Sequence, residues 1–351
     1  MKRLSVIVPT YNMEELLPKC LDSILRSVAS SALDVVVVND GSRDGSLAVA
    51  NRYAAEYPDI IRVIDKPNGN YGSTINAALP TLKGEYVKIL DSDDTFDSRL
   101  LSDYVDYLEQ VSGADMVVGP FVEIDSRGEH RVDYDIYSRK LYGYGQPYKA
   151  EQILSEGVVH YFMMHSVAYR TELLQQMGYR QSEGISYTDQ QWCFFPIFGV
   201  QSIAFTDIAL YRYNLTRAGQ TMDSSVQLKS INQLSQVVLS LAEYLDNYGE
   251  CLSAARYNFL SGVVVRRMQG VLRKYLLEMD DRQFAESDFA TVLSQFKSFA
   301  PQTLSVPING KLKIDLLQRW EQRARRYPQW LLRVLMCADS AMQRVYRLIF
   351  N

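Results

Sequence analysis

The chain has 351 residues, of which 47% are hydrophobic and 22% charged, and its formal net charge is −4. This composition is typical of an ordinary soluble protein with enough apolar residues for one large domain, or for one domain with a sizeable addition. Four cysteines without a C-x-x-C pair, together with only three histidines, argue against a zinc site and are typical of reduced intracellular thiols.

The beginning of the chain does not read as a signal peptide, because its apolar stretch already ends at Pro9. No stretch reaches the roughly 18 apolar residues that a membrane-spanning helix needs. We therefore expect a cytoplasmic protein.

Short β-branched runs recur along the first 120 residues, and stretches with helical spacing lie between them. Leu17, Leu21 and Leu25, for example, share one helical face. Near-continuous apolar strands that alternate with helices predict an α/β fold, with a Rossmann-like, mainly parallel sheet covered by helices on both faces. The predicted strands are 4–9, 34–40, 60–65, 86–90 and 114–119.

Polar clusters follow three of these strands: "PTYN" (9–12), "NDGSRDGS" (39–46) and "DSDD" (91–94). Ligands of such sheets bind beyond the carboxyl ends of the strands, where these clusters should meet at one edge. Asn, Asp, Gly and Ser also form turns, so each cluster alone could be a turn.

The third cluster needs more than a turn, because packed carboxylates repel one another. Asp91 and Asp93 are two residues apart, and an extended backbone points both to one face. Oxygen ligands without His or Cys favour Mg²⁺ or Mn²⁺, which proteins often share with the phosphates of a substrate. The cluster therefore predicts a divalent cation that carries a diphosphate.

Four segments together resemble a family 2 glycosyltransferase with the GT-A fold, in the order and spacing of that family: "SVIVPTYN" (5–12), "VVNDGSRDGS" (37–46), "NGNYGSTINAAL" (68–79) and "GEYVKILDSDD" (84–94). The resemblance covers roughly residues 1 to 220. It implies that Asp91 and Asp93 bind the metal, with Asp91 also touching the nucleotide. It further implies that Asp40 accepts a hydrogen bond from the base and that Thr10 and Tyr11 flank the nucleotide, with the Tyr11 ring as a stacking face.

The same resemblance implies donor contacts at Asn70 and Gly72 in the 68–76 loop. One position departs from the family pattern: Ile75 stands where many members carry an Arg shortly before the Asn that matches Asn76. The charge of the phosphates must then be balanced by the metal and by other cations.

The family places its catalytic base downstream, ahead of a helix with aromatic residues, and "GISYTDQQWCFFP" (184–196) matches that segment. Asp189 is the corresponding carboxylate, and Thr188 stands where a Glu is usual. An alternative is that Thr188 or Asp189 caps a helix that begins near Gln190.

Two arginines of "ALYRYNLTRAGQTM" (209–222), Arg212 and Arg217, are candidates for neutralising the departing diphosphate, and Arg217 is the one assigned to the donor site. Ordinary surface charge is the alternative for both. His165 could lie near the acceptor or could be a core or surface histidine.

The chain is expected to divide into a GT-A domain (1–225) and a helical C-terminal region (226–351). Within the domain, residues 1–120 form the nucleotide-sugar-binding half and residues 121–225 the acceptor half. The segment 330–350 reads as an amphipathic helix in a tail with a net charge of +6 (nine Lys/Arg and three Asp/Glu in 311–351). It could pack on the body or on a second subunit, or contact an anionic membrane surface from the cytoplasmic side.

The expected function is metal-dependent, inverting transfer of a sugar from a nucleotide-sugar, with a UDP-sugar as the expected donor. The acceptor would be a hydroxyl of a saccharide or lipid-linked molecule in surface polysaccharide synthesis, and no nucleic acid is expected as a partner. Two alternatives remain open: a nucleotide-binding scaffold on the same fold that has lost catalysis, and a haloacid-dehalogenase-type phosphatase, since "DSDDT" (91–95) fits its D-x-D-x-T motif.

Overall fold

The computed structural model describes residues 2–133, 142–157, 159–217, 224–279 and 282–299. Contacts divide the chain into two compact units. The first contains residues 1–221 and 252–259, and the second contains 222–251 and the chain from 260 onward. The division predicted from the sequence, between 225 and 226, leaves 252–259 out of the first unit.

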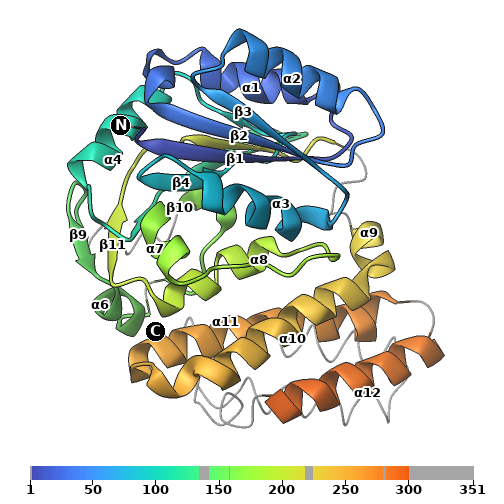
Figure 1. The fold of residues 1–351 in the computed structure, drawn as a ribbon. Coiled ribbons are helices and arrows are strands. Elements are labelled where there is room, and N and C mark those ends of the chain that lie inside the picture. The colour runs from blue at the N-terminus through green and yellow to red at the C-terminus, as the bar shows by residue number, and fades with distance from the viewer. Residues whose placement is uncertain (1, 134–141, 158, 218–223, 280–281, 300–351) are drawn as a thin grey trace. The chain divides into compact units, whose positions relative to one another are not determined.

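An eight-stranded sheet forms the centre of the first unit (Figure 1). Four neighbouring strands run parallel, β10 is antiparallel to both of its neighbours, and β11 is parallel to β6. The last strand, β9, is antiparallel to β11. In spatial order the strands are β3 (Ile61–Lys66), β2 (Leu33–Asp40), β1 (Leu4–Thr10), β4 (Tyr86–Ile89), β10 (Val167–Arg170), β6 (Met116–Val118), β11 (Ser202–Phe205) and β9 (Pro147–Lys149).

A second sheet of four short strands begins just after β4 in the chain and pairs the segment there with later strands. Its order is β5 (Thr95–Phe96), β12 (Tyr211–Asn214), β7 (Phe121–Asp125) and β8 (Gly128–Val132). β12 is antiparallel to β5 and parallel to β7, so this sheet joins the segment behind Asp94 to a strand more than 100 residues further along the chain.

Helices cover both faces of the larger sheet. Figure 1 shows α1 and α2 on one face of the parallel strands and α3 on the other. The helices of the first unit are α1 (Leu17–Leu25), α2 (Ser46–Glu56), α3 (Asn70–Ala78), α4 (Leu101–Gln110), α6 (Ala150–Ser155), α7 (Thr171–Gln176) and α8 (Asp189–Trp192). Short 3₁₀ turns lie at Val28–Ala32, Leu79–Thr81, Met164–Ser166 and Phe195–Phe198.

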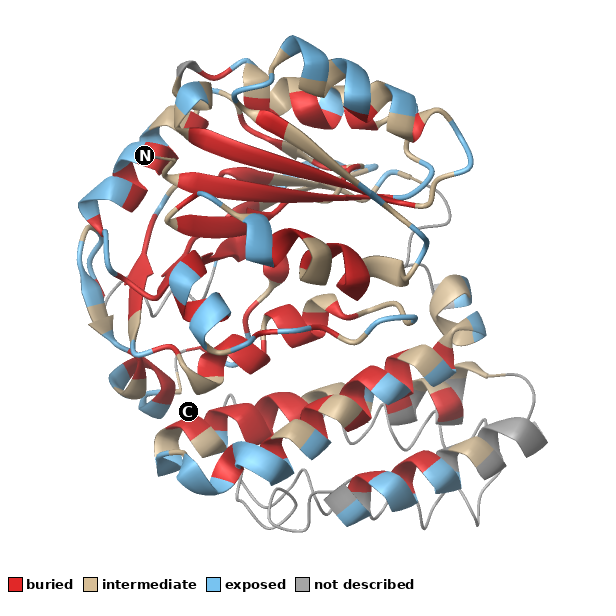
Figure 2. Cartoon of the chain, viewed as in Figure 1, coloured by how far each residue is buried: buried red, intermediate tan, exposed pale blue. Residues whose placement is uncertain are grey.

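The strand sequences explain why the parallel strands form the core. Every residue of β1 and β2 is buried (Figure 2), as expected for β-branched strands covered on both faces. One buried charged residue of β2 is Asp34, whose carboxylate is 3% exposed and accepts from Ser5, Arg62 and the Lys83 amide. It lies at the start of β2, so this compensated charge belongs to the edge opposite the polar clusters.

The second unit is helical in its described part. It contains α9 (Ser224–Lys229), α10 (Ile231–Tyr248), a 3₁₀ turn at Gly249–Cys251, most of α11 (Ala254–Arg273), a π-helical turn at Lys274–Glu278 and α12 (Arg282–Phe299). The 330–350 segment lies outside the described residues, so its predicted packing stays a prediction.

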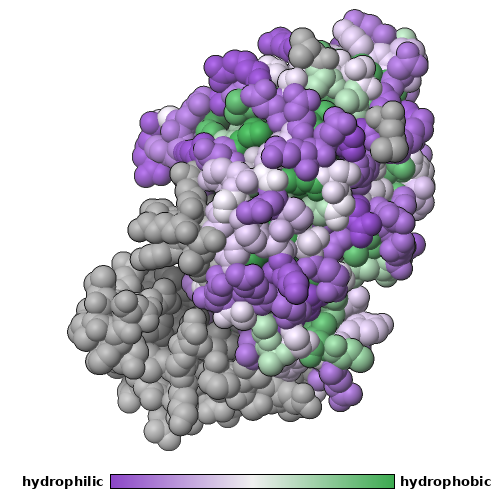
Figure 3. All heavy atoms as spheres, turned by 90° about the vertical axis from the view of Figure 1, so that its left-hand side faces the viewer, coloured by the Kyte–Doolittle hydropathy of each residue, from purple (hydrophilic) through white to green (hydrophobic). Residues whose placement is uncertain are grey.

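The described surface seen in Figure 3 is mostly hydrophilic, with apolar residues scattered among polar ones. Over the described ranges, no helix combines the length and the apolar character needed to cross a membrane.

Candidate active site

The polar clusters meet at one edge of the larger sheet, as the alternation predicts. β1 pairs with β2 up to Thr10 opposite Asn39, and it pairs with β4 up to Ile7 opposite Ile89. The segments that follow these three strands therefore leave the sheet side by side.

Three carboxylates gather just beyond β4. One oxygen from each of Asp91, Asp93 and Asp94 lies within 4.8 Å of the others. Burial, and then the neighbouring carboxylates, raise the pKa values of Asp91 and Asp94. A divalent cation would relieve this repulsion, and three hard oxygen donors within reach of one point fit Mg²⁺ or Mn²⁺.

Side chains from distant segments hold two of these carboxylates in place. The Tyr71 hydroxyl donates to Asp91 Oδ1 at 2.8 Å, and the Tyr211 hydroxyl donates to Asp94 Oδ2 at 2.6 Å. The backbone amide of Asn214 donates to Asp94 Oδ1 at 2.7 Å. Asp94 is thereby fixed more tightly than a turn residue would be, which the sequence did not indicate.

The two candidate arginines, Arg212 and Arg217, lie in different places and pair with different carboxylates. Arg217 Nη2 lies 2.9 Å from Asp93 Oδ2, so Arg217 joins the carboxylate cluster. Arg212 instead pairs with Glu129 and lies 3.9 Å from Asp97. Because side chains alternate along a strand, Tyr211 faces the cluster and Arg212 faces away.

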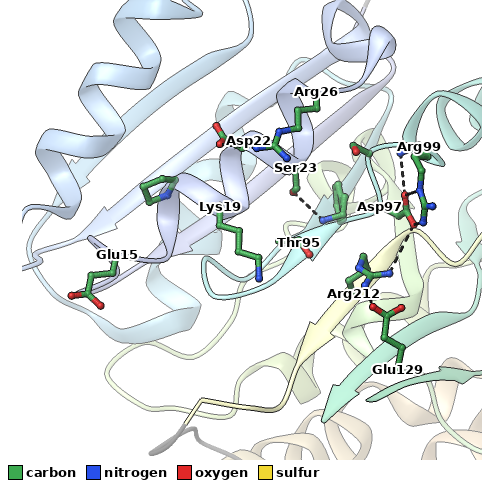
Figure 4. A pocket seen from close by; sticks show the side chains of 13 residues that line it. Glu15, Lys19, Asp22, Ser23, Arg26, Thr95, Asp97, Arg99, Glu129 and Arg212 are labelled. Atoms are coloured by element: carbon green, nitrogen blue, oxygen red, sulfur yellow. Dashed lines mark hydrogen bonds and ion pairs between the residues drawn. The ribbon is translucent and has the colours of Figure 1, made fainter. Parts of the chain in front are cut away.

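Arg212 lines a different pocket of about 550 Å³, between α1 and the smaller sheet (Figure 4). Lys19, Arg26 and Arg99 lie there beside Asp22 and Asp97, so positive and negative charges are mixed. The structure therefore places Arg212 away from the carboxylate cluster, and the strand alternation explains why.

His165 packs inside an aromatic cluster. It is 8% exposed, and its ring stacks on Tyr213 with the centroids 4.1 Å apart. Burial and the charge of Lys88 lower the pKa of His165 to about 3, so the ring is neutral. His165 is thus a core histidine that packs against Tyr211 and Tyr213.

Asp189 lies within electrostatic range of the carboxylate cluster. Burial and Asp91 raise the pKa of Tyr71, and Asp189 raises it further. Asp189 also adds to the raised pKa of Asp91, after burial and Asp93. The charge of Asp189 therefore acts on both Tyr71 and Asp91, which are bonded to each other.

The helix-capping alternative for Asp189 does not fit the geometry. Asp189 is the first residue of α8, and the preceding Thr188 occupies the cap position. The Thr188 side chain makes no capping hydrogen bond, and its buried Oγ1 has no partner within the described part of the chain. Thr188 is therefore not a side-chain cap, and Asp189 stands one position after the cap.

Comparison with known proteins supports the same interpretation. The family model described as "Glycosyl transferase family 2" matches residues 5–178. An uncharacterized glycosyltransferase of Rickettsia prowazekii is 24% identical over 304 residues, which cover 83% of this chain and 89% of that protein. The chain belongs to glycosyltransferase family 2.

Other family members match over shorter stretches. An uncharacterized glycosyltransferase of Mycoplasma pneumoniae is 38% identical over 33% of this chain and 38% of that protein. The poly(ribitol-phosphate) beta-glucosyltransferase of Bacillus spizizenii is 28% identical over 52% of this chain and 30% of that protein. The chain therefore matches only about a third of the length of these two relatives.

Solved structures confirm the GT-A fold. The crystal structure of S. aureus TarS (1–349) with UDP-GlcNAc superposes with a TM-score of 0.66 at 21% identity, over 92% of this chain and 87% of that one. A mannosyltransferase from Pyrobaculum calidifontis, in complex with GDP-Man and Mn²⁺, gives a TM-score of 0.52 at 18% identity. It covers 99% of this chain and 87% of that one. The phosphatase alternative is wrong, because Asp91 follows the fourth strand of this family's sheet rather than the first strand of a domain.

The expected nucleotide edge of this glycosyltransferase has a defined hydrogen-bond frame. Asp40 is 3% exposed, and its Oδ1 accepts from Lys66 Nζ at 2.7 Å and from the Gly69 amide at 2.9 Å. Asp40 thus holds the loop that leads into α3. Its contact with a base stays a prediction, as do the roles of buried Thr10 and of Tyr11, which is 42% exposed.

The "DGSRDGS" segment of this family member fixes the loop that carries Tyr11. Ser42 Oγ accepts from the Asn12 amide at 3.0 Å, and Ser46 Oγ accepts from the Met13 amide at 2.7 Å. Asp44 accepts from the Glu14 amide at 3.1 Å. These bonds give the segment a structural function that the sequence motif alone did not reveal.

The two predicted donor contacts in the 68–76 loop lie at the start of α3. Asn70 adopts a φ of 63°, in the left-handed region that non-glycine residues seldom occupy. Gly72 is buried, and a Cβ there would come within 2.1 Å of the Ser182 carbonyl oxygen. The glycine is thus required for packing, and donor contact at Asn70 and Gly72 stays a prediction.

Proposed function

We propose that this chain is a metal-dependent, inverting glycosyltransferase that moves a sugar from a nucleotide-sugar, with a UDP-sugar as donor, to an acceptor hydroxyl. The observation that carries the proposal is the Asp91, Asp93 and Asp94 cluster at the carboxyl edge of the sheet, where the charge of Asp189 also acts on Asp91. Family membership supports it, as do the complexes of structural neighbours with UDP-GlcNAc and with GDP-Man and Mn²⁺.

Asp91, Asp93 and Asp94 would hold the cation, and Tyr71 and Tyr211 would orient two of these carboxylates. When bound, Mg²⁺ or Mn²⁺ would neutralise the charge that develops on the diphosphate leaving group. Arg217, now paired with Asp93, would add a second positive charge beside it.

Asp189 would accept the proton of the attacking hydroxyl as the new glycosidic bond forms and the bond to the diphosphate breaks. A single displacement of this kind inverts the configuration at the anomeric carbon. Asp40, Thr10, Tyr11, Asn70 and Gly72 would surround the nucleotide.

The acceptor class follows from the relatives. One of them is a poly(ribitol-phosphate) beta-glucosyltransferase, and we infer a saccharide or lipid-linked acceptor in surface polysaccharide synthesis. This transfer would take place in the cytoplasm. Contact of the 330–350 segment with the membrane, or a homodimer, would bring the enzyme to its acceptor.

The test begins with the full chain and a panel of UDP-glucose, UDP-N-acetylglucosamine, UDP-galactose and GDP-mannose. Release of the nucleoside diphosphate, with water as acceptor, is measured in Mn²⁺, in Mg²⁺ and in EDTA. We expect turnover of a UDP-sugar that EDTA abolishes. Equal turnover in EDTA would contradict the metal dependence, and thermal stabilisation by UDP without turnover of any donor would favour the scaffold alternative.

Asp189→Asn tests the base in the same assay. Removing a general base lowers rates by about 10²–10⁴-fold, so hydrolysis of the preferred donor should fall by that factor while UDP affinity stays near that of the parent. Asp103→Asn, on the exposed side of α4, is the control. An Asp189→Asn protein that turns over at the parental rate would remove Asp189 from the mechanism.

A further inference from the structure

A short segment, 181–184, lies between α3 and α8 and is bonded to both. On the α3 side, Asn76 Nδ2 donates to the Gln181 carbonyl at 2.9 Å, and Asn76 Oδ1 accepts from the Gln181 amide at 2.8 Å. The Gly184 amide donates to the Gly69 carbonyl at 2.8 Å. The segment therefore packs along α3, and Gly72 leaves the room that it needs.

On the α8 side, Gln191 is bonded to the segment. Gln191 is fully buried, and its Oε1 accepts from the Ser182 amide at 2.8 Å. Its Nε2 donates to Ser182 Oγ, also at 2.8 Å. Both ends of the Gln191 carboxamide are thus engaged with a single residue, which fixes the distance between α8 and the segment.

The two helices that this segment joins carry the two sides of the proposed reaction. α3 carries Tyr71, which bonds Asp91 in the cation cluster, and α8 begins with Asp189. The chain between this segment and α8 also has a strained backbone. Tyr187, two residues before Asp189, has a φ of 68°. A bulky residue persists in that conformation only where its surroundings over-determine it.

We propose that Gln191 is the positioning residue that sets the place of Asp189 relative to the cation cluster, by tying α8 to Ser182 and through it to α3. The proposal rests on the base assigned to Asp189. Loss of the tie would let α8 shift while the donor edge of the sheet stays intact, and a shift of about 1 Å at a catalytic group costs on the order of 10²-fold in rate.

The first test compares Gln191→Met with Gln190→Met. Methionine keeps the length of glutamine without its hydrogen bonds, and Gln190 is a matched control: it is 8% exposed, neighbours Gln191 in α8, and its Oε1 has no partner among the described residues. Hydrolysis of the preferred UDP-sugar gives kcat and KM, and titration gives the UDP affinity.

We expect Gln191→Met to lower kcat by about 10–100-fold with KM and UDP affinity within about twofold of the parent. Gln190→Met should stay within about twofold in all three. A Gln191→Met protein with parental kcat, or one whose loss lies in KM and UDP affinity, would overturn the proposal.

The second test asks whether Gln191 acts through Asp189. In an Asp189→Asn background, Gln191→Met should change the residual rate by less than about twofold, because the group that it positions is already absent. The same fold loss in both backgrounds would show an effect independent of Asp189. Parental turnover of Asp189→Asn alone would instead refute the base, so the two failures are distinguishable.

Ser182→Ala covers the case in which Gln191→Met does not fold. It removes the Ser182 Oγ bond and keeps the bond from the Ser182 amide. We expect a smaller loss of kcat, about 3–10-fold, that again disappears in the Asp189→Asn background. Parental kcat in Ser182→Ala, when Gln191→Met cannot be measured, would count against the tie.

Discussion

Three carboxylates can share one small volume here because each has a different partner. Tyr71 bonds Asp91, Arg217 pairs with Asp93, and Tyr211 bonds Asp94. Hydrogen bonds to the charged form offset part of the cost of burial, and an ion pair offsets more. The three carboxylates therefore stay within reach of one cation.

The substitution Asp93→Ala tests directly whether the carboxylate cluster binds a cation. The alanine removes one of three donors and the partner of Arg217, so the Mn²⁺-dependent part of UDP binding should be lost, with affinity in Mn²⁺ falling by about tenfold or more, or about 1.4 kcal/mol. Calorimetric titration of UDP with and without Mn²⁺ measures this, and Asp103→Ala serves as the exposed control. Equal affinity of variant and parent in Mn²⁺ would contradict the assignment.

The raised pKa values of the cluster make the metal-free protein sensitive to pH. Asp91 is raised to about 7 and Asp94 to about 8, mainly by burial, whereas both lie near 3.9 when unfolded. The folded state therefore binds more protons than the unfolded state across this window, and stability falls as pH rises from about 4 to 8.

Thermal unfolding in EDTA at pH 5.5 and 8.5 measures this fall, and Mn²⁺ at pH 8.5 should reverse it. Asp94→Asn should reduce the difference between the two pH values, because one of the two titrating groups is gone. An unfolding midpoint in EDTA that does not decrease between these pH values would argue against protonated carboxylates in the cluster.

Loops attached to strand ends, rather than the strands, set the geometry of the nucleotide edge. Ser46 is fully buried, accepts from the Met13 amide and donates to Asp44 Oδ1 at 2.5 Å. Ser42 makes a similar bond to the Asn12 amide at an exposed position. The loop that carries Tyr11 is thus held by bonds at both buried and exposed positions.

Ser46→Ala should therefore weaken the edge more than Ser42→Ala. Leaving the Met13 amide unpaired in a part-buried site costs about 1–3 kcal/mol, whereas water can replace the Ser42 bond. Chemical denaturation measures the stability, and UDP titration should show a weaker affinity for Ser46→Ala. Equal effects of the two variants would show that the buried bond has no special importance.

The strands and helices of the first 120 residues could be predicted, because the local pattern of apolar residues determines them. The predicted strand 34–40 corresponds to Leu33–Asp40, and 86–90 to Tyr86–Ile89. The antiparallel insertion of β10 between β4 and β6 could not be predicted, since four residues, Val167–Arg170, carry no pattern that specifies a partner 80 residues away.

In the candidate active site, too, contacts between residues distant in sequence could not be predicted. The resemblance located Asp91, Asp93 and Asp189, but Tyr71 stands in a quoted motif with no sign that its hydroxyl would reach Asp91. The alternation of Tyr211, Arg212 and Tyr213 along β12 could have excluded Arg212, had the strand been placed beside Asp94.

For the whole molecule, the first unit is not continuous in sequence. Arg256, at the start of α11, is 3% exposed and donates to the carbonyls of Ile197 and Phe198, both at 2.9 Å. It also pairs with Glu151 at 2.8 Å. The turn that follows α8 is thereby bonded to residues that the predicted boundary at 225 assigns elsewhere.

Truncation tests this organisation. A chain ending near residue 310 retains Arg256 and should keep parental UDP affinity. A chain ending at 225 lacks it, leaves two carbonyls and Glu151 without their partner, and should be less stable by at least about 1–3 kcal/mol. Denaturation and UDP titration compare the two, with Arg256→Met in the full chain as the matched point variant. A 225-residue chain as stable as the longer one would show that Arg256 is dispensable.

The position of Arg256 also has a consequence for synthesis. The first stretch of the unit ends at residue 221 and its last piece at residue 259, so 38 more residues must be translated before the unit has all its parts. At about 5–20 residues per second, this interval lasts roughly 2–8 s. During that time Glu151 lacks its partner Arg256. Phe162 likewise lacks Phe259, which packs on it in the finished fold. The nascent domain is therefore completed only after translation of the start of α11, which supplies Arg256 and Phe259.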